Sequence, residues 1–341
     1  MKKAVLLLNL GTPDNPTPEA VGAYLREFLM DPLVIDIPWV FRTVLVNALI
    51  VPRRSHASAK LYDKIWTQRG SPLLFHTQDL EKAVQEKLGE EYRVVAGMRY
   101  GNPSFEAAVE KLVGQDLSSV TIVPLYPQYA LAATESSLRK IRTVLDKRLP
   151  GIKRVEVPAF YNNENYLNAV AEVSRKPLHE FKSDLVLFSF HGLPERQIRK
   201  TKTGKACVFT KECCSHITPQ NADCYRAQSF ATARLLAEKL DIPVGKYKVS
   251  FQSRLGTTPW IRPFADEFYR TFPSLGIKNL AVLCPSFVAD CLETLEEVQM
   301  RGQEEFRRYG GLNLKLIPSL NSHPAWVQGL SRMVQDYQPS K

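Results

Sequence analysis

The chain has 341 residues, a length that at about 150 residues per domain predicts two domains. Hydrophobic residues make up 44% of it and charged residues 23%, which excludes a disordered, collagen-like or disulfide-stapled protein. The 45 Lys and Arg against 35 Asp and Glu give a net charge of +10. We therefore expect an acidic partner. The net charge does not decide whether this partner is a nucleic acid, an anionic membrane surface or a small polycarboxylate.

The N-terminal segment resembles a signal peptide but is better explained as a buried strand. Its apolar run is short and ends in Gly11-Thr12-Pro13-Asp14 without a small-residue cleavage site. Elsewhere, no segment approaches the roughly 20 uncharged apolar residues of a membrane-spanning helix. We therefore expect a cytoplasmic protein, in which the six cysteines stay reduced.

Short apolar runs alternate with amphipathic stretches along the chain. We expect strands at 4–10, 93–98, 120–124 and 154–157, and again at 185–190, 247–251, 280–283 and 312–316. Helical patterns lie between them, at 75–88, 105–112, 135–149 and 229–240. Near-continuous apolar strands with helical crossovers predict parallel sheets covered on both faces. The chain is therefore expected to fold as two similar α/β halves.

Polar motifs follow the expected strands at the points where the strands end. They lie at 11–13, 99–101 and 126–129 in the first half, and at 191–194, 252–254 and 284–285 in the second. Open parallel sheets bind ligands at the carboxyl ends of their strands. Two such sheets facing one another would line an interdomain cleft with these loops.

Two groups of side chains in the second half could carry chemistry. The neutral imidazole of His191, at a strand end, can accept a proton or bind a metal, although it could instead cap the strand through backbone hydrogen bonds. Asp290, Glu293 and Glu297 would share one face of a helix. Apolar neighbours make such an acidic stripe costly to bury without a cation or proton. The alternative is a solvated face that the helix dipole favours.

Four cysteines cluster in one segment, and an apolar segment precedes two arginines. The cysteine spacing lacks the C-x2–4-C pairs of zinc sites and is compatible with an iron–sulfur cluster, with zinc or unliganded thiols as alternatives. The remaining two, Cys284 and Cys291, are expected to be buried small hydrophobes. The 33–62 segment could be a core helix, or a cleft lip in which Arg53 and Arg54 meet ligand carboxylates. The clustered cysteines are Cys207, Cys213, Cys214 and Cys224.

Seven motifs in one order resemble the ferrochelatases, enzymes that insert ferrous iron into a porphyrin. The motifs are LNLGTP (8–13), GSPL (70–73), MRYG (98–101), LYPQY (125–129), SFHGLP (189–194), QSR (252–254) with PW (259–260), and ADCLETLEE (289–297). Each motif is weak alone, but together they cover nearly the whole chain.

The resemblance implies two Rossmann-like domains of the chelatase type, each a parallel sheet of four strands flanked by helices, with the active-site cleft between them. The expected domains are 1–160, with a helix at 323–338 packing back on it, and 161–322, with the cysteine insertion at 195–226. The porphyrin contacts that the resemblance implies are Leu10, Arg54, Tyr62, Ser71, Arg99, Tyr126 and Trp260.

The resemblance also implies the reaction, the last step of haem biosynthesis, catalysed by a lyase that makes protohaem from protoporphyrin IX and Fe²⁺. His191 would accept a pyrrole proton or bind the metal, and Glu293, assisted by Glu297, would present Fe²⁺ from the opposite side. We expect separate lobes to supply the imidazole and this acid. Cys291 replaces a second histidine found in animal relatives, and Glu135 replaces a glycine.

The cysteine segment resembles the internal [2Fe–2S] insertion of certain bacterial ferrochelatases. Its ligands would be the four clustered cysteines. The segment 195–226 carries seven Lys and Arg against three Asp and Glu, so it could also contact an anionic membrane peripherally.

Other functions remain as alternatives at this stage. The nearest is a chelatase for coproporphyrin or another tetrapyrrole, although Leu10 stands where coproporphyrin-using relatives often have tyrosine, which favours protoporphyrin IX. From another class come a non-enzymatic haem-binding protein and an iron–sulfur redox sensor. A nucleic-acid partner is not expected, because the basic residues form no recognition-helix or aromatic-platform pattern.

Overall fold

The computed structural model describes residues 1–203, 207, 209–210, 212–254, 256 and 258–337. The chain divides into two units. Unit 1 comprises Met1–Tyr126, Leu131–Pro158 and Leu330–Lys341, and unit 2 comprises Pro127–Ala130 and Ala159–Gly329. Helix α13 (Pro324–Asp336) therefore begins in unit 2 and ends in unit 1.

Strand β1 (Lys2–Thr12) lies in the interior of the unit 1 sheet. Its residues 4–8 are fully buried, because both faces of the strand are covered. It pairs in parallel with β2 (Tyr92–Gly101) on one side and with β3 (Leu117–Pro124) on the other, and β4 (Lys153–Glu156) pairs with β3. The strand order β2-β1-β3-β4 confirms the parallel sheet predicted for the first half.

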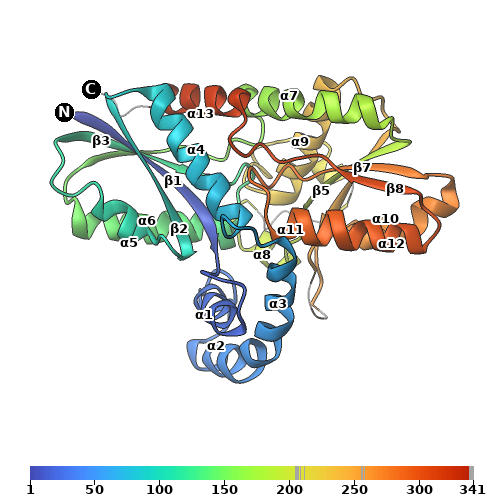
Figure 1. Ribbon diagram of the computed structural model, residues 1–341, viewed down its shortest axis with the longest axis horizontal. Helices are drawn as coiled ribbons and strands as arrows, with labels where there is room; N and C mark the ends of the chain where they lie inside the picture. The colour runs from blue at the N-terminus through green and yellow to red at the C-terminus, as the bar shows by residue number, and fades with distance from the viewer. Residues whose placement is uncertain (204–206, 208, 211, 255, 257, 338–341) are drawn as a thin grey trace. The chain divides into compact units, whose positions relative to one another are not determined.

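Helices cover both faces of this sheet (Figure 1). On one face, α5 (Phe105–Glu110) and α6 (Ser136–Arg148) enclose a core that includes Leu6, Leu8 and Ile141. On the other face lies α4 (Pro72–Leu88), in contact with β1 and β2. A π-helical turn, η2 (Leu131–Glu135), leads into α6, so this α-helix begins one residue later than predicted.

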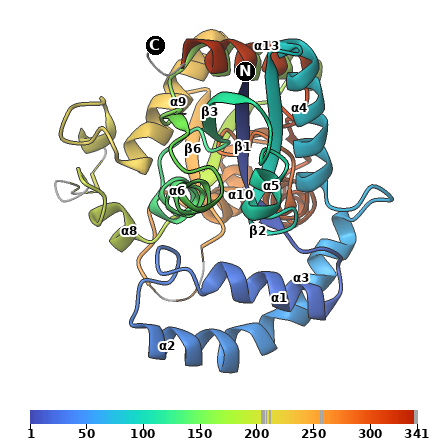
Figure 2. The ribbon, with the colours of Figure 1, turned by 90° about the vertical axis from the view of Figure 1, so that its left-hand side faces the viewer.

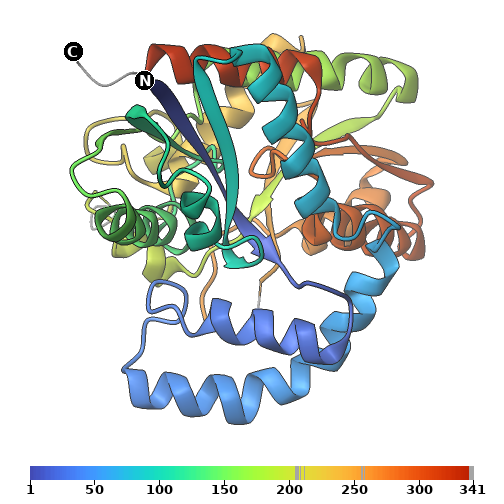
Figure 3. The same cartoon turned by 60° about the vertical axis from the view of Figure 1, so that its left-hand side comes forward.

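A helical excursion separates β1 from α4. It consists of α1 (Pro18–Leu29), α2 (Trp39–Val44), the π-helical η1 (Leu45–Ile50) and α3 (Val51–Ile65). The last three run on as one continuous rod that lies beside α1 (Figures 2 and 3). Trp39 and Phe41 of α2 are 65% and 68% exposed, so this end of the rod is apolar and open to solvent.

Unit 2 repeats the topology of unit 1. Its central strand β5 (Leu185–His191) pairs in parallel with β6 (Tyr247–Gln252) and with β7 (Asn279–Leu283), and β8 (Asn313–Leu316) pairs with β7. The order β6-β5-β7-β8 corresponds strand for strand to that of unit 1. The prediction of two similar parallel α/β halves is therefore confirmed.

Helices also cover both faces of the unit 2 sheet (Figure 1). One face carries α7 (Glu164–Phe181) and α9 (Tyr225–Lys239), and the other carries α10 (Ala265–Thr271), the π-helical η6 (Leu295–Gly302) and α12 (Gln303–Arg308). Shorter elements are α8 (Glu195–Arg199), η4 (Glu212–Cys214), η5 (Phe272–Leu275) and α11 (Leu292–Thr294). Within the described ranges, no helix is both long enough and apolar enough to cross a membrane.

Candidate active site

His191 is the last residue of β5, at the carboxyl end of the central strand of unit 2. Its Nδ1 lies 2.6 Å from the carbonyl oxygen of Gly192. Because a carbonyl oxygen only accepts hydrogen bonds, Nδ1 carries the proton and Nε2 of the neutral ring keeps its lone pair. The ring also meets Phe287 edge to face, with centroids 6.2 Å apart. The imidazole is thus oriented through one nitrogen and chemically available through the other.

Gly192 lets the chain turn closely past the neighbouring strand after His191. Its N–H donates to the carbonyl oxygen of Gln252, 2.7 Å away. A Cβ at this position would lie 2.6 Å from that same oxygen and 3.3 Å from the ring of Trp260. A side chain here would therefore displace the turn that orients His191, which is the physical reason for the His-Gly pair.

Glu293 lies in the first turn of the short helix α11. Cys291 caps this helix, with its N–H donating to Oγ1 of Thr294 at 3.0 Å. Burial raises the pKa of the Cys291 thiol well above its usual value, and the charge of Glu293 and a hydrogen bond with it add to this effect. Cys291 is buried as expected, but it is also a neutral thiol partner of Glu293 and more than a small hydrophobe.

Glu297 lies four residues further on, in the π-helical η6. Its carboxylate accepts two hydrogen bonds from Ser253, one from the backbone N–H at 2.8 Å and one from Oγ at 2.5 Å. Burial raises the pKa of Glu297, an effect opposed by the hydrogen bonds from Ser253, by the charge of Arg301 and by that of His191 when its ring is protonated. This acid is therefore held in place, with its pKa above the ordinary value.

Asp290 does not join these acids on a helical face, because the helix begins only at Leu292. Its carboxylate accepts hydrogen bonds from Asn321 Nδ2 at 2.8 Å, from Thr294 Oγ1 at 3.1 Å and from the N–H of Ser319. The prediction that three acids share one helical face is therefore wrong for Asp290. Asp290 ties the start of the acidic helix to the loop that follows β8.

His191, Glu293 and Glu297 all belong to unit 2. The charge of Glu293, and that of His191 when its ring is protonated, act on the carboxyl group of Glu297, so the three side chains share one electrostatic environment. The expectation that separate lobes supply the imidazole and Glu293 is therefore wrong. The parallel topology explains the result, because strand ends and the helices that follow them meet at one edge of a sheet.

Arg99, one of the predicted porphyrin contacts, is engaged inside unit 1. Its Nη2 donates to the buried carboxylate of Asp31 at 2.5 Å, and its Nε donates to Ser136 Oγ at 2.8 Å. Tyr100 and Ser136 also donate to Asp31, at 2.9 and 2.5 Å. Burial raises the pKa of Tyr100, and the neighbouring charges of Arg99 and Asp31 act in opposite directions. These four side chains form one buried polar network at the end of β2.

The other predicted porphyrin contacts fall into buried and accessible sets. Ser71 accepts a hydrogen bond from Thr12 Oγ1 at 2.8 Å and is buried, and Tyr62 packs edge to face between Tyr24 and Trp66. Tyr126 hydrogen-bonds Ser137 at 3.1 Å, and burial raises the pKa of its phenol. Arg54 is exposed on α3, while Leu10 and Trp260 are partly exposed.

The four clustered cysteines are free thiols in unit 2. The sulfurs of Cys213 and Cys214 lie 3.7 Å apart, and Cys207 hydrogen-bonds Cys224, an interaction that together with burial raises the pKa of its thiol. Arg226 donates to the sulfur of Cys214 at 2.9 Å. No set of three or more His, Cys, Asp or Glu side chains poised to hold a metal ion occurs in the described part of the chain. The predicted cluster is therefore not supported by the present arrangement of these thiols.

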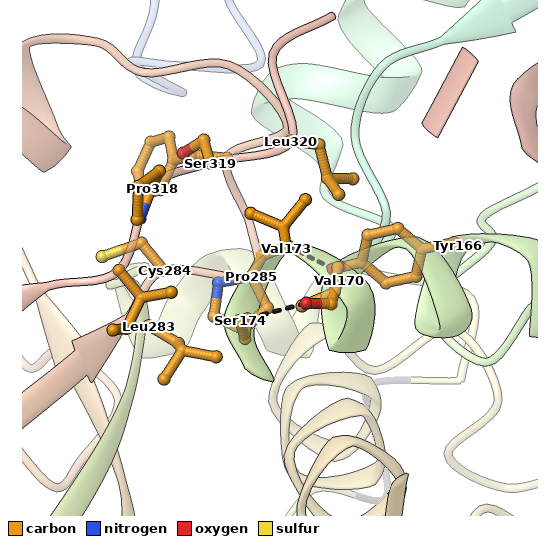
Figure 4. Close-up of a pocket in the computed structure, with 12 residues that line it drawn as sticks. Tyr166, Val170, Val173, Ser174, Leu283, Cys284, Pro285, Pro318, Ser319 and Leu320 are labelled. Carbon is orange, nitrogen blue, oxygen red and sulfur yellow. Dashed lines mark hydrogen bonds between the residues drawn. The ribbon is translucent and has the colours of Figure 1, made fainter. Parts of the chain in front are cut away.

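Phe287 is one of the residues that line a small cavity in unit 2 (Figure 4). Its volume is about 20 Å³, room for one water molecule and far too little for a tetrapyrrole. Two of its hydroxyl groups are bonded to backbone: Tyr166 donates to the carbonyl oxygen of Pro285 at 2.6 Å, and Ser174 donates to that of Val170 at 2.7 Å. This cavity is a packing void next to the site.

The sequence reasoning missed several residues that hold the site together. Asp31 and Ser136 form the polar network around Arg99, while Gln252 and Ser253 bind the acidic helix. Gln252 and Ser253 were visible as part of a polar motif after a strand, but no spacing rule shows which side chain a motif residue contacts. Asp31 carried no such signal, because its partners in this network lie 68 to 105 positions away.

Two parallel sheets of one topology, with a histidine at a strand end of the second and two acids on the helical segments that follow β7, define a protein with a chelatase-type fold. The fold is similar to that of the sirohydrochlorin chelatase SirB from Bacillus subtilis subspecies spizizenii in complex with cobalt, with a TM-score of 0.54. The match covers 98% of this chain and 95% of that one, at 12% sequence identity. This likeness concerns the fold alone.

Sequence comparisons identify the family. The ferrochelatase family model matches residues 2–338. Ferrochelatases from Coxiella burnetii (strain Dugway 5J108-111) and Legionella pneumophila (strain Lens) are each 45% identical to this chain and cover 98% of it. The matches span 93% and 99% of those relatives. The chain belongs to the ferrochelatase family, which confirms the resemblance seen in its motifs.

Proposed function

We propose that this protein inserts Fe²⁺ into protoporphyrin IX to form protohaem. The observation that carries the proposal is the state of His191, in a chain of the ferrochelatase family. Its Nδ1–H is bound to the backbone while Nε2 keeps a lone pair, and the ring shares an electrostatic environment with Glu297 and Glu293. An oriented base beside two carboxyl groups is what the exchange of two pyrrole protons for a divalent cation requires.

The reaction removes two N–H protons from the porphyrin and replaces them with one Fe²⁺. In the proposed mechanism, Nε2 of His191 takes the two pyrrole protons one after the other, releasing the first to solvent before it takes the second, and Glu293 and Glu297 present the cation. Imidazole and carboxylate ligands both suit Fe²⁺. The small number of protein ligands matters, because a closed, high-affinity site would retain the metal instead of passing it on.

The porphyrin contacts form a second part of the proposal. The exposed guanidinium of Arg54 is suited to a propionate, and the partly exposed Leu10 and Trp260 are suited to the apolar ring. Tyr62 and Ser71 would shape the pocket from buried positions, and Tyr126 would do so from a partly buried one. For Arg99 we propose an indirect role, since its Nε and Nη2 are already bound to Ser136 and Asp31.

The test is an anaerobic assay of metal insertion. Purified protein is mixed with Fe²⁺ and protoporphyrin IX, and the loss of porphyrin fluorescence and the appearance of haem absorption are followed. Parallel reactions contain coproporphyrin, or Co²⁺ or Ni²⁺ in place of iron. Turnover fastest with Fe²⁺ and protoporphyrin IX is expected. Faster turnover of coproporphyrin or another metal would replace this substrate assignment, and tight binding of porphyrin without any insertion would contradict the enzymatic function.

The [2Fe–2S] cluster is a separate proposal, supported by the resemblance of the cysteine segment to the internal insertion of certain bacterial ferrochelatases and by the four free thiols in that segment. Cys207, Cys213, Cys214 and Cys224 would be its ligands, and the cluster would supply a one-electron redox centre. Protein purified anaerobically should show a visible charge-transfer absorption with about two irons per chain. Cys214→Ser should bleach it, whereas Cys284→Ser should not. A colourless, iron-free protein would contradict the proposal.

Peripheral contact with an anionic membrane is also proposed. It is supported by the basic segment 195–226 and by Trp39, Val40 and Phe41, which are exposed on α2. The protein should co-float with phosphatidylserine-containing vesicles, and Trp39→Ser with Phe41→Ser should reduce the bound fraction. Equal flotation of the wild type with and without vesicles would rule the contact out.

A further inference from the structure

The end of β6 is bonded to the acidic helix at two consecutive residues. Gln252 Nε2 donates to the backbone carbonyl oxygen of Glu293 at 2.8 Å. Ser253 then donates through both its N–H and its Oγ to the carboxylate of Glu297. The first contact fixes the backbone that carries one acid, and the second fixes the side chain of the other.

Ser253 adopts a backbone conformation that serine disfavours. Its φ is +67°, in the left-handed region where a Cβ is strained and glycine is not. Such strain persists where the surroundings hold the residue in place, and it concentrates at functional sites. A glycine would adopt this φ and keep the backbone N–H bond to Glu297. What serine adds is its hydroxyl, and that hydroxyl donates to Glu297 at 2.5 Å.

Glu297 has a competing attraction. The charge of Arg301, four residues further along the same π-helical segment, also acts on its carboxyl group. Arg301 itself is 55% exposed in its side chain and pairs with Glu296 at 3.2 Å. A Glu297 side chain released from Ser253 would therefore be free to turn toward Arg301 and lose its single orientation.

We infer that Ser253 is a positioning residue that acts through Glu297. It holds the carboxylate in one orientation, so that Glu297 works with Glu293 on the incoming cation. The inference rests on the proposed iron insertion. It adds Ser253 to the residues that serve this reaction, because the protein retains the serine hydroxyl although the side chain strains the backbone. The inference therefore predicts that turnover depends on the hydroxyl of Ser253, whereas stability depends on the strain that its Cβ places on the backbone.

Three substitutions separate the hydroxyl from the backbone strain. Ser253→Ala removes the hydroxyl and keeps the strain, Ser253→Gly removes both, and Ser253→Thr keeps the hydroxyl and adds a β-branched carbon. The Tm is expected to fall in the order Gly, Ala, Thr, following the backbone. Turnover is expected to follow the hydroxyl, with Ala and Gly both at least about tenfold slower than wild type and Thr close to it. Should Thr not fold, the Ala and Gly pair still decides the matter.

The kinetic parameters distinguish positioning from a general loss of structure. In Ser253→Ala and Ser253→Gly, kcat should fall while the KM for porphyrin stays within about twofold, because Glu297 acts on the cation and not on the ring. Ser253→Ala should also add less than about twofold to the loss already caused by Glu297→Gln, since a residue acting through another has no effect once that partner is gone. Additive losses would overturn the inference.

Lys182→Gly is the matched control for the backbone. Lys182 is also left-handed, with a φ of +50°, but it is exposed at the end of α7. Lys182→Gly should raise the Tm above that of the wild type, just as Ser253→Gly should have a higher Tm than Ser253→Ala. It should not slow turnover. If wild-type protein inserts iron and Ser253→Gly keeps a kcat within twofold of it, the positioning role is wrong. If wild-type protein inserts no metal, the proposed function fails first.

Discussion

The carboxylate of Asp31 accepts a hydrogen bond from Nη2 of Arg99 at 2.5 Å within unit 1. The side chains are 4% and 14% exposed, so the charges are removed from water and depend on each other. Asp31 follows helix α1, whereas Arg99 lies near the end of β2. The ion pair therefore fastens the helical excursion that starts at residue 18 to the sheet.

Asp31→Asn is expected to destabilise the protein strongly. It leaves the Arg99 guanidinium buried without its counter-ion, a change that costs about 3–5 kcal/mol in the free energy of unfolding. Asp79→Asn is the control, because the Arg69–Asp79 pair has similar geometry at 2.6 Å but Arg69 is 56% exposed. That variant should lose less than about 1 kcal/mol. Denaturant titration measures both, and equal losses would show that burial of the Asp31 pair is unimportant.

His191→Ala and Glu293→Gln should each abolish iron insertion while porphyrin binding stays largely intact. The first removes the Nε2 lone pair, and the second removes the charge that attracts the cation. Porphyrin affinity is measured by fluorescence titration, and insertion is measured by the appearance of haem. His179→Ala, on the exposed side of α7, should behave as wild type. Near-normal turnover in either site variant would remove that residue from the mechanism.

Gly192→Ala should lower both activity and stability, although the change adds a single methyl group. The new Cβ would lie 2.6 Å from the carbonyl oxygen of Gln252, so the turn carrying His191 must shift. Overpacking of this kind costs about 1–3 kcal/mol. Gly22 lies inside helix α1, and a Cβ added there would make only ordinary contacts at 3.5 Å. Gly22→Ala should therefore keep or raise the Tm. Unchanged turnover in Gly192→Ala would show that the His191 turn tolerates displacement.

Glu297→Gln should change how stability depends on pH. Burial raises the pKa of Glu297 above its ordinary value of 4.5, so the folded protein holds this proton more tightly than the unfolded chain does. The contribution of Glu297 to the free energy of unfolding therefore falls as the pH rises from about 4.5 through the raised pKa. Glutamine does not titrate, so the free energy of unfolding of the variant should rise relative to that of the wild type across this pH range. Parallel stability curves from pH 4 to 8 would contradict the assignment.

The periodic features of the fold were predictable from the sequence, and the contacts that hold the site were only partly so. Each of the eight predicted strands is present, with ends that differ by at most three residues, because buried parallel strands are continuous apolar runs. Helix α9 begins at Tyr225, four residues before the predicted start, because Arg226 and Gln228 are polar side chains buried in its first turns.

The position of His191 followed from the end of an apolar strand, but the partners of the acids did not. The rule that acids at i, i+3 and i+7 share a face assumes a helix throughout, and Asp290 precedes the helix. Gln252 and Ser253 reach Glu293 and Glu297 across 41 and 44 positions. Such pairings depend on how strands and helices pack, which a local pattern does not encode.

The two units share a strand order, and each carries its extra segment in the same connection. In unit 1 the helical excursion lies between the first strand and the second, and in unit 2 the cysteine segment lies between β5 and β6. Neither interrupts the strand pairing around it. A sensor peptide or an affinity handle is therefore expected to disturb this scaffold least when it is inserted in one of these two crossovers, because the sheets pair in the same order around both extra segments.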